Sequence, residues 1–316
     1  MTRRLLVAAA IGVVTLAVAA GQLTHVLGPA GMLAENIRGM RPSYAPTRVA
    51  AVPNEKAIVG RVWVPGLDDG YNPQGLTVVE GALLVSAYRS DDPNRNRGPC
   101  RVFRIDPESG REMGHVDVPV PCGHAGGLAD PGEGLLYVAD THALFETLLR
   151  QAFSGQALPF RGVALGPGLT GALAVSAPGA IWLGTYKEDE EGRLFRFTTA
   201  KLTRPRNGAQ LTVSDASAQL AIPSHAQGGA LDRDGRLWVA RSANRWGELA
   251  RLDLATGAVE RRYAVAAGIE GIAFDGNGLL WAVSEAGARH TWDNFFARLV
   301  MPFFPLVFAI DPQRLE

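Results

Sequence analysis

Short runs of alternating hydrophobic and polar residues, separated by turns that contain Gly and Asp, fill most of this chain. The clearest run, residues 228–240 (GGALDRDGRLWVA), returns 43 positions later as residues 271–283 (GIAFDGNGLLWAV). Each copy joins a strand of small residues to a Leu-Trp strand through an Asp/Gly turn, and such a unit cannot bury its apolar faces alone. Repeats of about 40–50 residues of this kind predict the blades of a β-propeller.

Five such units follow one another along the chain. Each begins with a glycine on its predicted innermost strand, and these glycines are Gly75, Gly126, Gly171, Gly228 and Gly271. Third strands are predicted at 102–106, 194–197, 249–253 and 306–311, and outer strands at 112–118 and 259–265. We therefore expect an all-β fold, with one five-bladed propeller of four-stranded blades over residues 56–316. Six blades are the alternative if residues 151–168 form a degenerate one, and residues 142–153 fit a strand or a helical insertion equally.

The fifth unit shows no outer strand between its third strand and Glu316. Residues 58–64 (IVGRVWV) form a predicted strand before the first unit and belong to no blade. We expect this strand to complete the last blade, which closes the ring and leaves no exposed sheet edge.

Residues 1–20 have the pattern of an export signal. Arg3 and Arg4 precede the apolar stretch 5–16, and the small-residue segment 17–19 (AVA) resembles a cleavage site. The alternative is an uncleaved membrane anchor. The whole apolar run, residues 5–20, has 16 residues, which is shorter than the ~20 that a spanning helix prefers. We expect export to the periplasm or the cell exterior, and we interpret residues 21–55 as a linker.

The charge balance and the cysteine count narrow the function classes. The 31 Lys and Arg residues balance 31 Asp and Glu residues, so the chain lacks the basic field of a nucleic-acid binder. Cys100 opens one predicted strand and Cys122 follows the strand paired with it, which places both near the open end of one hairpin. A disulfide is expected, with two unpaired thiols as the alternative. Two cysteines without nearby histidines are too few for zinc, and we expect a monomer.

The candidate site residues gather in loops that open on one face of the predicted propeller. These loops enter the innermost strands or follow the second strands, and rigid scaffolds commonly carry binding and catalytic groups in such loops. Asp140 has a structural alternative, because it could cap the turn that follows it. The candidates are Gln74, Tyr88, His124, Asp140, His142, Thr170, Tyr186, His225, Gln227, Arg241, Arg245, Glu270, Glu285 and His290.

Glu270 is the strongest single candidate. A carboxylate entering a propeller channel is costly unless a metal, a cation or a partner compensates it; the alternative is an ion pair with Arg241 or Arg245. In an enzymatic interpretation, Glu270 is a metal ligand or general base and His225 or His124 is an acid/base. Arg241 or Arg245 would then hold an anionic group. The sequence contains no Gly-x-Ser-x-Gly elbow and no His-Glu-x-x-His helix.

At residues 268–275 (GIEGIAFD) and 278–281 (GLLW), the chain resembles the calcium-dependent propellers of the gluconolactonase/SMP-30 group. It is also similar to NHL-type and streptogramin-lyase-like propellers, and the resemblance spans residues 58–312. The first resemblance implies lactone hydrolysis and a metal ligand in the Glu-Gly pair that begins at Glu270. The second implies a functional histidine, which His225 could supply. The remaining calcium ligands of the lactonase group are Asn and Asp, whereas the corresponding residues here are Gln74, Ala125, Thr170 and Gln227, a set poor in charged oxygens.

An aromatic segment, residues 292–305 (WDNFFARLVMPFFP), interrupts the last unit beside the candidate face. It is expected to be a lid, a membrane or protein contact, or packing at the end of the channel. Taken together, the sequence predicts an exported propeller that binds a small polar ligand and hydrolyses or eliminates it. The competing prediction is a non-catalytic scaffold that docks a protein or envelope partner through this face.

Overall fold

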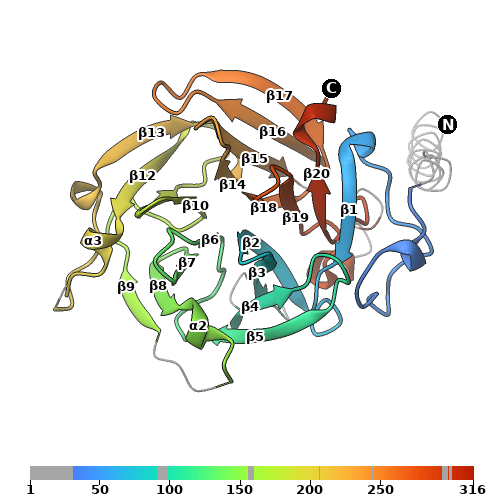
Figure 1. The fold of residues 1–316 in the computed structure, drawn as a ribbon, viewed down its shortest axis with the longest axis horizontal. Coiled ribbons are helices and arrows are strands. Elements are labelled where there is room, and N and C mark those ends of the chain that lie inside the picture. Colours follow the sequence, from blue (N-terminus) through green and yellow to red (C-terminus); the bar gives the residue numbers. More distant parts are fainter. Residues whose placement is uncertain are drawn as a thin grey trace, which may run out of the picture.

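Five antiparallel sheets of four strands each surround one central axis (Figure 1). The computed structural model describes residues 31–90, 98–155, 160–205, 207–243, 245–293, 298 and 301–316. The predicted all-β, five-bladed propeller is confirmed. The expected export signal, residues 1–20, lies outside the described residues.

The strands follow one another from the channel outward in every blade. Blade one contains β2 (Tyr71–Val79), β3 (Ala82–Arg89), β4 (Cys100–Ile105) and β5 (Glu112–Val118). Blade two contains β6 (Gly127–Ala129), β7 (Leu135–Asp140), β8 (Ala143–Leu148) and β9 (Arg161–Ala164). Blade three contains β10 (Leu173–Ala177), β11 (Ala180–Gly184), β12 (Gly192–Thr198) and β13 (Ala218–Ile222). Blade four contains β14 (Ala226–Leu231), β15 (Leu237–Ala243), β16 (Trp246–Leu252) and β17 (Val259–Val265). Blade five contains β18 (Ile269–Phe274), β19 (Leu280–Ser284), β20 (Leu306–Ile310) and, as its outer strand, β1 (Ile58–Trp63).

The helices in the described part of the chain are short. They are α2 (Leu149–Ala152), α3 (Thr199–Leu202), α4 (Arg289–Trp292) and the 3₁₀ turns Ala34–Asn36, Glu55–Ala57, Val213–Asp215 and Pro312–Arg314. In blade two, the ambiguous residues 142–153 form β8 followed by the single turn α2. Residues 151–168 supply β9 as the outer strand of that blade, so they do not form a sixth one. In the described part of the chain, no helix is long and apolar enough to cross a membrane.

The N-terminal strand closes the ring as predicted. β1 pairs antiparallel with β20, with Val62 opposite Val307 and Trp63 opposite Leu306, and Figure 1 shows this first strand lying beside the last one. Residues 31–55, within the range expected to be a linker, pack against blade five. Ala34 and Val49 are buried there.

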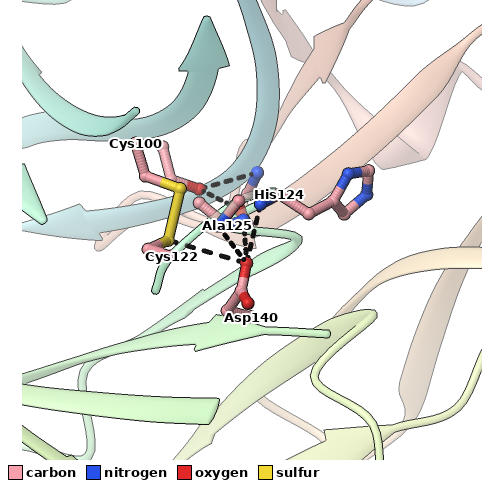
Figure 2. The surroundings of a disulfide bond; sticks show 8 residues. Cys100, Cys122, His124, Ala125 and Asp140 are labelled. Carbon is pink, nitrogen blue, oxygen red and sulfur yellow. Dashed lines mark hydrogen bonds between the residues drawn. A yellow bond between two sulfur atoms is a disulfide. The ribbon is translucent and has the colours of Figure 1, made fainter. Parts of the chain in front are cut away.

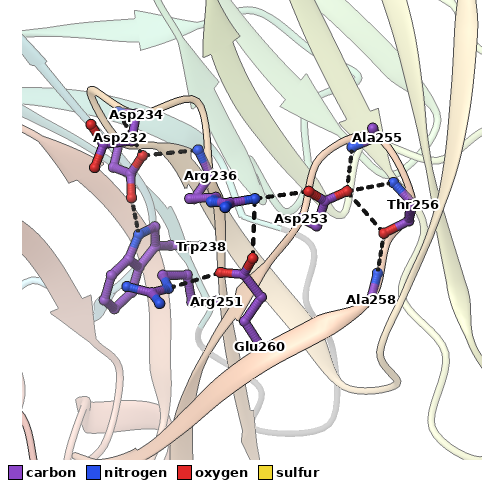
Figure 3. Close-up of polar contacts among 10 residues, drawn as sticks. All are labelled: Asp232, Asp234, Arg236, Trp238, Arg251, Asp253, Ala255, Thr256, Ala258 and Glu260. Atoms are coloured by element: carbon purple, nitrogen blue, oxygen red, sulfur yellow. Dashed lines mark hydrogen bonds and ion pairs between the residues drawn. The ribbon is translucent and has the colours of Figure 1, made fainter.

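The repeated Asp/Gly turn and the repeated tryptophan contact one another. In blade four, one carboxylate oxygen of Asp232 accepts the backbone N–H groups of Asp234 and Arg236, at 3.0 and 2.8 Å, and the other accepts the indole N–H of Trp238 at 2.9 Å (Figure 3). Asp275 and Trp281 repeat this arrangement in blade five, with 3.1 Å between indole nitrogen and carboxylate. The carboxylate thus accepts hydrogen bonds from the backbone N–H groups of the turn and from the buried indole N–H. This double role explains why the sequence repeats Asp and Trp at a fixed spacing.

The described phenylalanines of the aromatic segment are packed inside the protein. Phe303 and Phe304 are buried, and the Phe303 ring contacts those of Trp292 and Tyr44, with centroids 4.6 and 5.9 Å apart. Residues 294–297, with two of the four phenylalanines, lie outside the described residues. Phe303 also accepts the backbone N–H of Ala50 at 2.9 Å, so its contacts hold the N-terminal segment to blade five.

Candidate functional site

Three aromatic rings contact one another on the candidate face. The loops that enter innermost strands and those that follow second strands open here, and we call this face the mouth. The Tyr88 ring at the end of β3 stacks on His124, with centroids 5.1 Å apart and planes inclined by 28°, and meets the edge of His290 at 6.2 Å. Three predicted residues from blades one, two and five therefore come together.

Glu285 contacts the polar residues below these rings. Its carboxylate accepts hydrogen bonds from the Asn72 amide at 2.7 Å and from the Gln74 amide at 3.0 Å. The Asn72 amide also donates to the Tyr88 hydroxyl at 2.8 Å. Sequence reasoning missed Asn72, although its position two residues before Gln74 on the innermost strand was a signal that could have found it.

Glu270 lies at a bulge in β18, between the paired residues Ile269 and Ile272. Glu270 is only 2% exposed, and among the described residues its hydrogen-bond partner is the Ser242 hydroxyl at 3.5 Å. Burial, reinforced by the negative charge of Glu285, raises the pKa of Glu270 well above its usual value. The mouth therefore contains two carboxylates in different environments, an arrangement that separates acid from base roles in enzymes.

We expect Glu270→Gln to stabilise the protein at pH 8 and to leave it nearly unchanged at pH 4. The unfolded chain loses the Glu270 proton near the ordinary pKa of about 4.5, whereas the folded protein holds that proton to higher pH. The folded state thus binds more protons above pH 4.5, and stability falls as pH rises towards the folded pKa. Gln keeps the shape without the titration.

Chemical denaturation of both proteins at the two pH values in metal-free buffer measures this effect. Glu108→Gln, in an exposed turn, is the matched control. A Glu270→Gln variant less stable than the parent at pH 8 would contradict the expectation.

His124 and His290 both favour the neutral form. Burial lowers the pKa of His124 and of His290, and the charge of Glu285 opposes this shift in each case. The Nδ1 atom of each ring is buried without a hydrogen-bond partner. Neutral imidazoles with spare nitrogens, close to a carboxylate, can accept a proton near neutral pH.

A hollow of about 700 Å³ opens beside His290. Its lining is mostly charged, with guanidinium and carboxylate groups in equal number. The lining residues are Asp68, Asp69, Gly70, Tyr71, Arg89, Ser90, Arg101, Arg289, His290 and Asp293. Arg289 is fixed by a hydrogen bond to the Asp68 carbonyl at 2.9 Å, and Arg101 by its ion pair with Asp117 at 2.6 Å. This hollow fits a small molecule rich in polar groups.

A second aromatic group surrounds His225 on blades three and four. The His225 ring meets the edges of Tyr186 and Trp246, with centroids 6.0 and 5.4 Å apart. Arg241 lies over the Trp246 ring and pairs with Glu248.

The remaining predicted residues have separate positions. Arg241 lies within β15 rather than in the loop after it, and Arg245 is exposed beside Trp246. Glu270 therefore makes no ion pair with either arginine. His142 is exposed, Gln227 lies at a bulge in β14, and the Thr170 hydroxyl donates to the Gly184 carbonyl at 3.3 Å.

Cys100 and Cys122 form the predicted disulfide, with Cα atoms 5.8 Å apart. Asp140 lies close to both sulfurs. Disulfide sulfurs are not metal ligands, so this group is no metal centre. Asp140 instead accepts three backbone N–H groups from residues 123–125 (Figure 2).

A calcium ion, the metal that the family resemblance implies, would have one more oxygen donor here than the sequence suggested. The Asn72 Oδ1 atom is buried without a partner. The amide of the same residue donates to the Glu285 carboxylate, whose charge also acts on Glu270. Carboxylate and amide oxygens are the ligands that calcium prefers. The Gln74 amide nitrogen donates to Glu285 and to the Pro73 carbonyl, so this atom is not a calcium ligand.

Comparisons with known proteins show the fold. No protein-family model and no curated protein matches the chain. Among solved structures, it is similar to the glutaminyl cyclase of Myxococcus xanthus, with 15% identity, 80% of this chain and 94% of that chain covered, and a TM-score of 0.51. It is also similar to the calcium-binding protein regucalcin of Agrobacterium tumefaciens, with 17% identity, 80% and 93% coverage, and a TM-score of 0.44. A luciferin-regenerating enzyme matches with 12% identity, 76% and 74% coverage, and a TM-score of 0.39. Regucalcin is thus among the solved structures to which the chain is similar, and at these identities the likeness concerns the fold alone.

Proposed function

We propose that the mouth binds a small polar ligand, seated in the hollow with His290 against it. The observation that carries this proposal is the position of His290, which lines the hollow and also contacts Tyr88. Through that contact the hollow borders the buried network of Glu285 and Asn72. A concave site next to titratable groups with shifted pKa values is the usual setting of a binding or catalytic centre.

The chemistry we propose is hydrolysis of a hydroxylated lactone. His290, neutral because burial lowers its pKa, takes a proton from a water molecule as the water oxygen bonds to the lactone carbonyl carbon. The ring carbon–oxygen bond then breaks, and the proton passes to the departing alkoxide. The negative charge of Glu285 stabilises the transient imidazolium. Guanidinium and carboxylate groups of the hollow suit the carboxylate and the hydroxyls of the product.

A calcium ion, if bound, would be held by Glu270, Glu285 and Asn72. It would polarise a carbonyl oxygen and neutralise the carboxylates, which raises the fraction of Glu270 that is ionised. This part of the proposal rests on the donor set alone.

Export to the periplasm or the cell exterior completes the proposal. A disulfide is compatible with an oxidising compartment. The pattern of residues 1–20 is that of an export signal.

The test is a hydrolysis screen over a panel of sugar lactones, with metal analysis of the purified protein. We expect His290→Gln to lower the rate by about 10²–10⁴-fold, the usual contribution of a general base. His142→Gln replaces an exposed histidine of the same face and should leave the rate unchanged. Glu270→Gln should lower the metal content if calcium is bound. A rate that is equal in the parent and His290→Gln would contradict the proposed role of His290.

A panel that yields no hydrolysis at all would favour the alternative, a non-catalytic scaffold that docks a protein or envelope partner. Phe303 and Phe304 are buried, so they offer no surface for such a partner. The same panel in a binding assay separates a protein that binds lactones without hydrolysis from one that binds none.

A further inference from the structure

The loop that carries His124 is fixed to its surroundings by a covalent bond. Cys122, two residues before His124, is bonded to Cys100 at the start of β4. Cys100 is the cross-strand partner of Tyr88 in the β3–β4 register. The disulfide therefore joins the loop to the residue directly beside the tyrosine on which the His124 ring stacks.

Asp140 fixes the same loop from the second blade. One oxygen of its carboxylate accepts the backbone N–H groups of Gly123, His124 and Ala125, at 3.0, 2.7 and 3.0 Å. Figure 2 shows this carboxylate pointing toward His124 and Ala125. Three converging donors compensate a buried negative charge that would otherwise be costly. They also hold Ala125 in the left-handed region, at φ 53°, a conformation that a residue with a Cβ seldom adopts unless its surroundings impose it.

Two further hydrogen bonds complete the attachment. The Ser86 hydroxyl donates to the Ala125 carbonyl at 2.7 Å, and the Gly98 N–H donates to the Gly123 carbonyl at 3.0 Å. The backbone on both sides of His124 is thus bound to blade one and to blade two. The His124 side chain itself has no hydrogen bond at its buried Nδ1 atom, so the backbone attachments and the Tyr88 ring determine where the imidazole lies.

We propose that Asp140 and the Cys100–Cys122 disulfide are a positioning device, which holds the His124 ring against Tyr88 as one wall of the mouth. Asp140 is then a positioning residue and does not contact the ligand, in contrast to the expectation from the sequence. This inference deepens the proposed function and rests on it for its consequence, because the wall matters only if the mouth binds a ligand. The placement of His124 can be tested without any ligand.

The readout is the NMR signal of the His124 ring, assigned through a His124→Gln variant. The neighbouring Tyr88 ring displaces the chemical shift of this signal. The groups whose charges act on the titration of His124 are Glu285, Asp140 and His290. In Asp140→Ala, we expect the displacement by Tyr88 to be lost and the pKa of His124 to rise towards its ordinary value, because the ring becomes exposed. The double variant Cys100→Ala/Cys122→Ala should show the same direction.

Asp140→Asn distinguishes positioning from charge. The Asn side chain keeps an oxygen that can accept the three N–H groups, so the displacement by Tyr88 should persist, while loss of the negative charge lowers the pKa of His124. Asp232→Ala removes a comparable turn-holding carboxylate far from the mouth, and it should leave the His124 signal unchanged.

A folded Asp140→Ala protein with an unaltered His124 signal would overturn the inference. If the signal moves as expected but no lactone is hydrolysed by the parent, the positioning device stands and the proposed hydrolysis fails. Should Asp140→Ala fail to fold, the disulfide variant and Asp140→Asn decide the question with the same readout. An unaltered signal in the double cysteine variant and a lost displacement in Asp140→Asn would then overturn it.

Discussion

Gly271→Ala is expected to lower the free energy of unfolding by about 3 kcal/mol, the upper part of the usual range for an overpacked core position. A Cβ atom at residue 271 would lie 2.2 Å from the Leu76 backbone nitrogen and 2.6 Å from the Gly75 carbonyl carbon. Both atoms belong to the innermost strand of blade one, so neither can move aside as a flexible side chain would. The substitution must push the innermost strand of the fifth blade away from that of the first.

The matched control is Gly276→Ala in the turn of the same blade. A Cβ atom there meets nothing within 4 Å, and the backbone is outside the left-handed region. For a domain of this size the expected loss corresponds to about 6–12 °C in melting temperature, measured by calorimetry beside the control. Equal melting temperatures for the two variants would show that the innermost strands are not in close contact.

Val62→Asp is expected to cost about 4 kcal/mol or more, because it buries a carboxylate without a partner. Val62 is fully buried in β1, opposite Val307 of β20. The substitution therefore disrupts the strand pairing that joins β1 to the last blade. Since that pairing closes the ring, we expect loss of the cooperative unfolding transition or precipitation of the protein.

Val59→Asp provides the comparison within the same strand. Val59 is 44% exposed, so its carboxylate would remain in water and the cost should stay within ~0.5 kcal/mol. Denaturant unfolding of both variants measures the difference. Similar stabilities would mean that β1 does not close the ring in solution.

The sequence predicted the architecture because its repeat reflects direct contacts. The Asp232–Trp238 and Asp275–Trp281 pairs bind one another in consecutive blades, so a fixed spacing of residue types marks a fixed geometry. The alignment of the repeats also predicted which face carries the site, because the equivalent loops of every blade lie on the same face. Tyr88, His124, Glu285 and His290 were predicted on that face, and the structure brings them together.

The arrangement within the mouth could not be predicted in the same way. Arg241 was expected to reach the mouth, but β15 extends beyond it and places it opposite Glu248 in the cross-strand register, where an ion pair forms. Asn72 was missed because an amide on an inner strand carries no motif. The hollow was missed because its lining comes from segments distant in sequence, such as residues 68–71 and 289–293. Such contacts depend on the path of loops whose residues do not repeat.

A crystal structure of the protein soaked with a sugar lactone would test most directly the claim that the mouth binds a small polar ligand. We predict electron density for the lactone, or for the hydroxy acid that its hydrolysis yields, in the hollow against His290 and Arg289. Density confined to a separate pocket lined by Trp246 and Arg245, or to the pocket lined by Leu76 and Ile272, would contradict the claim.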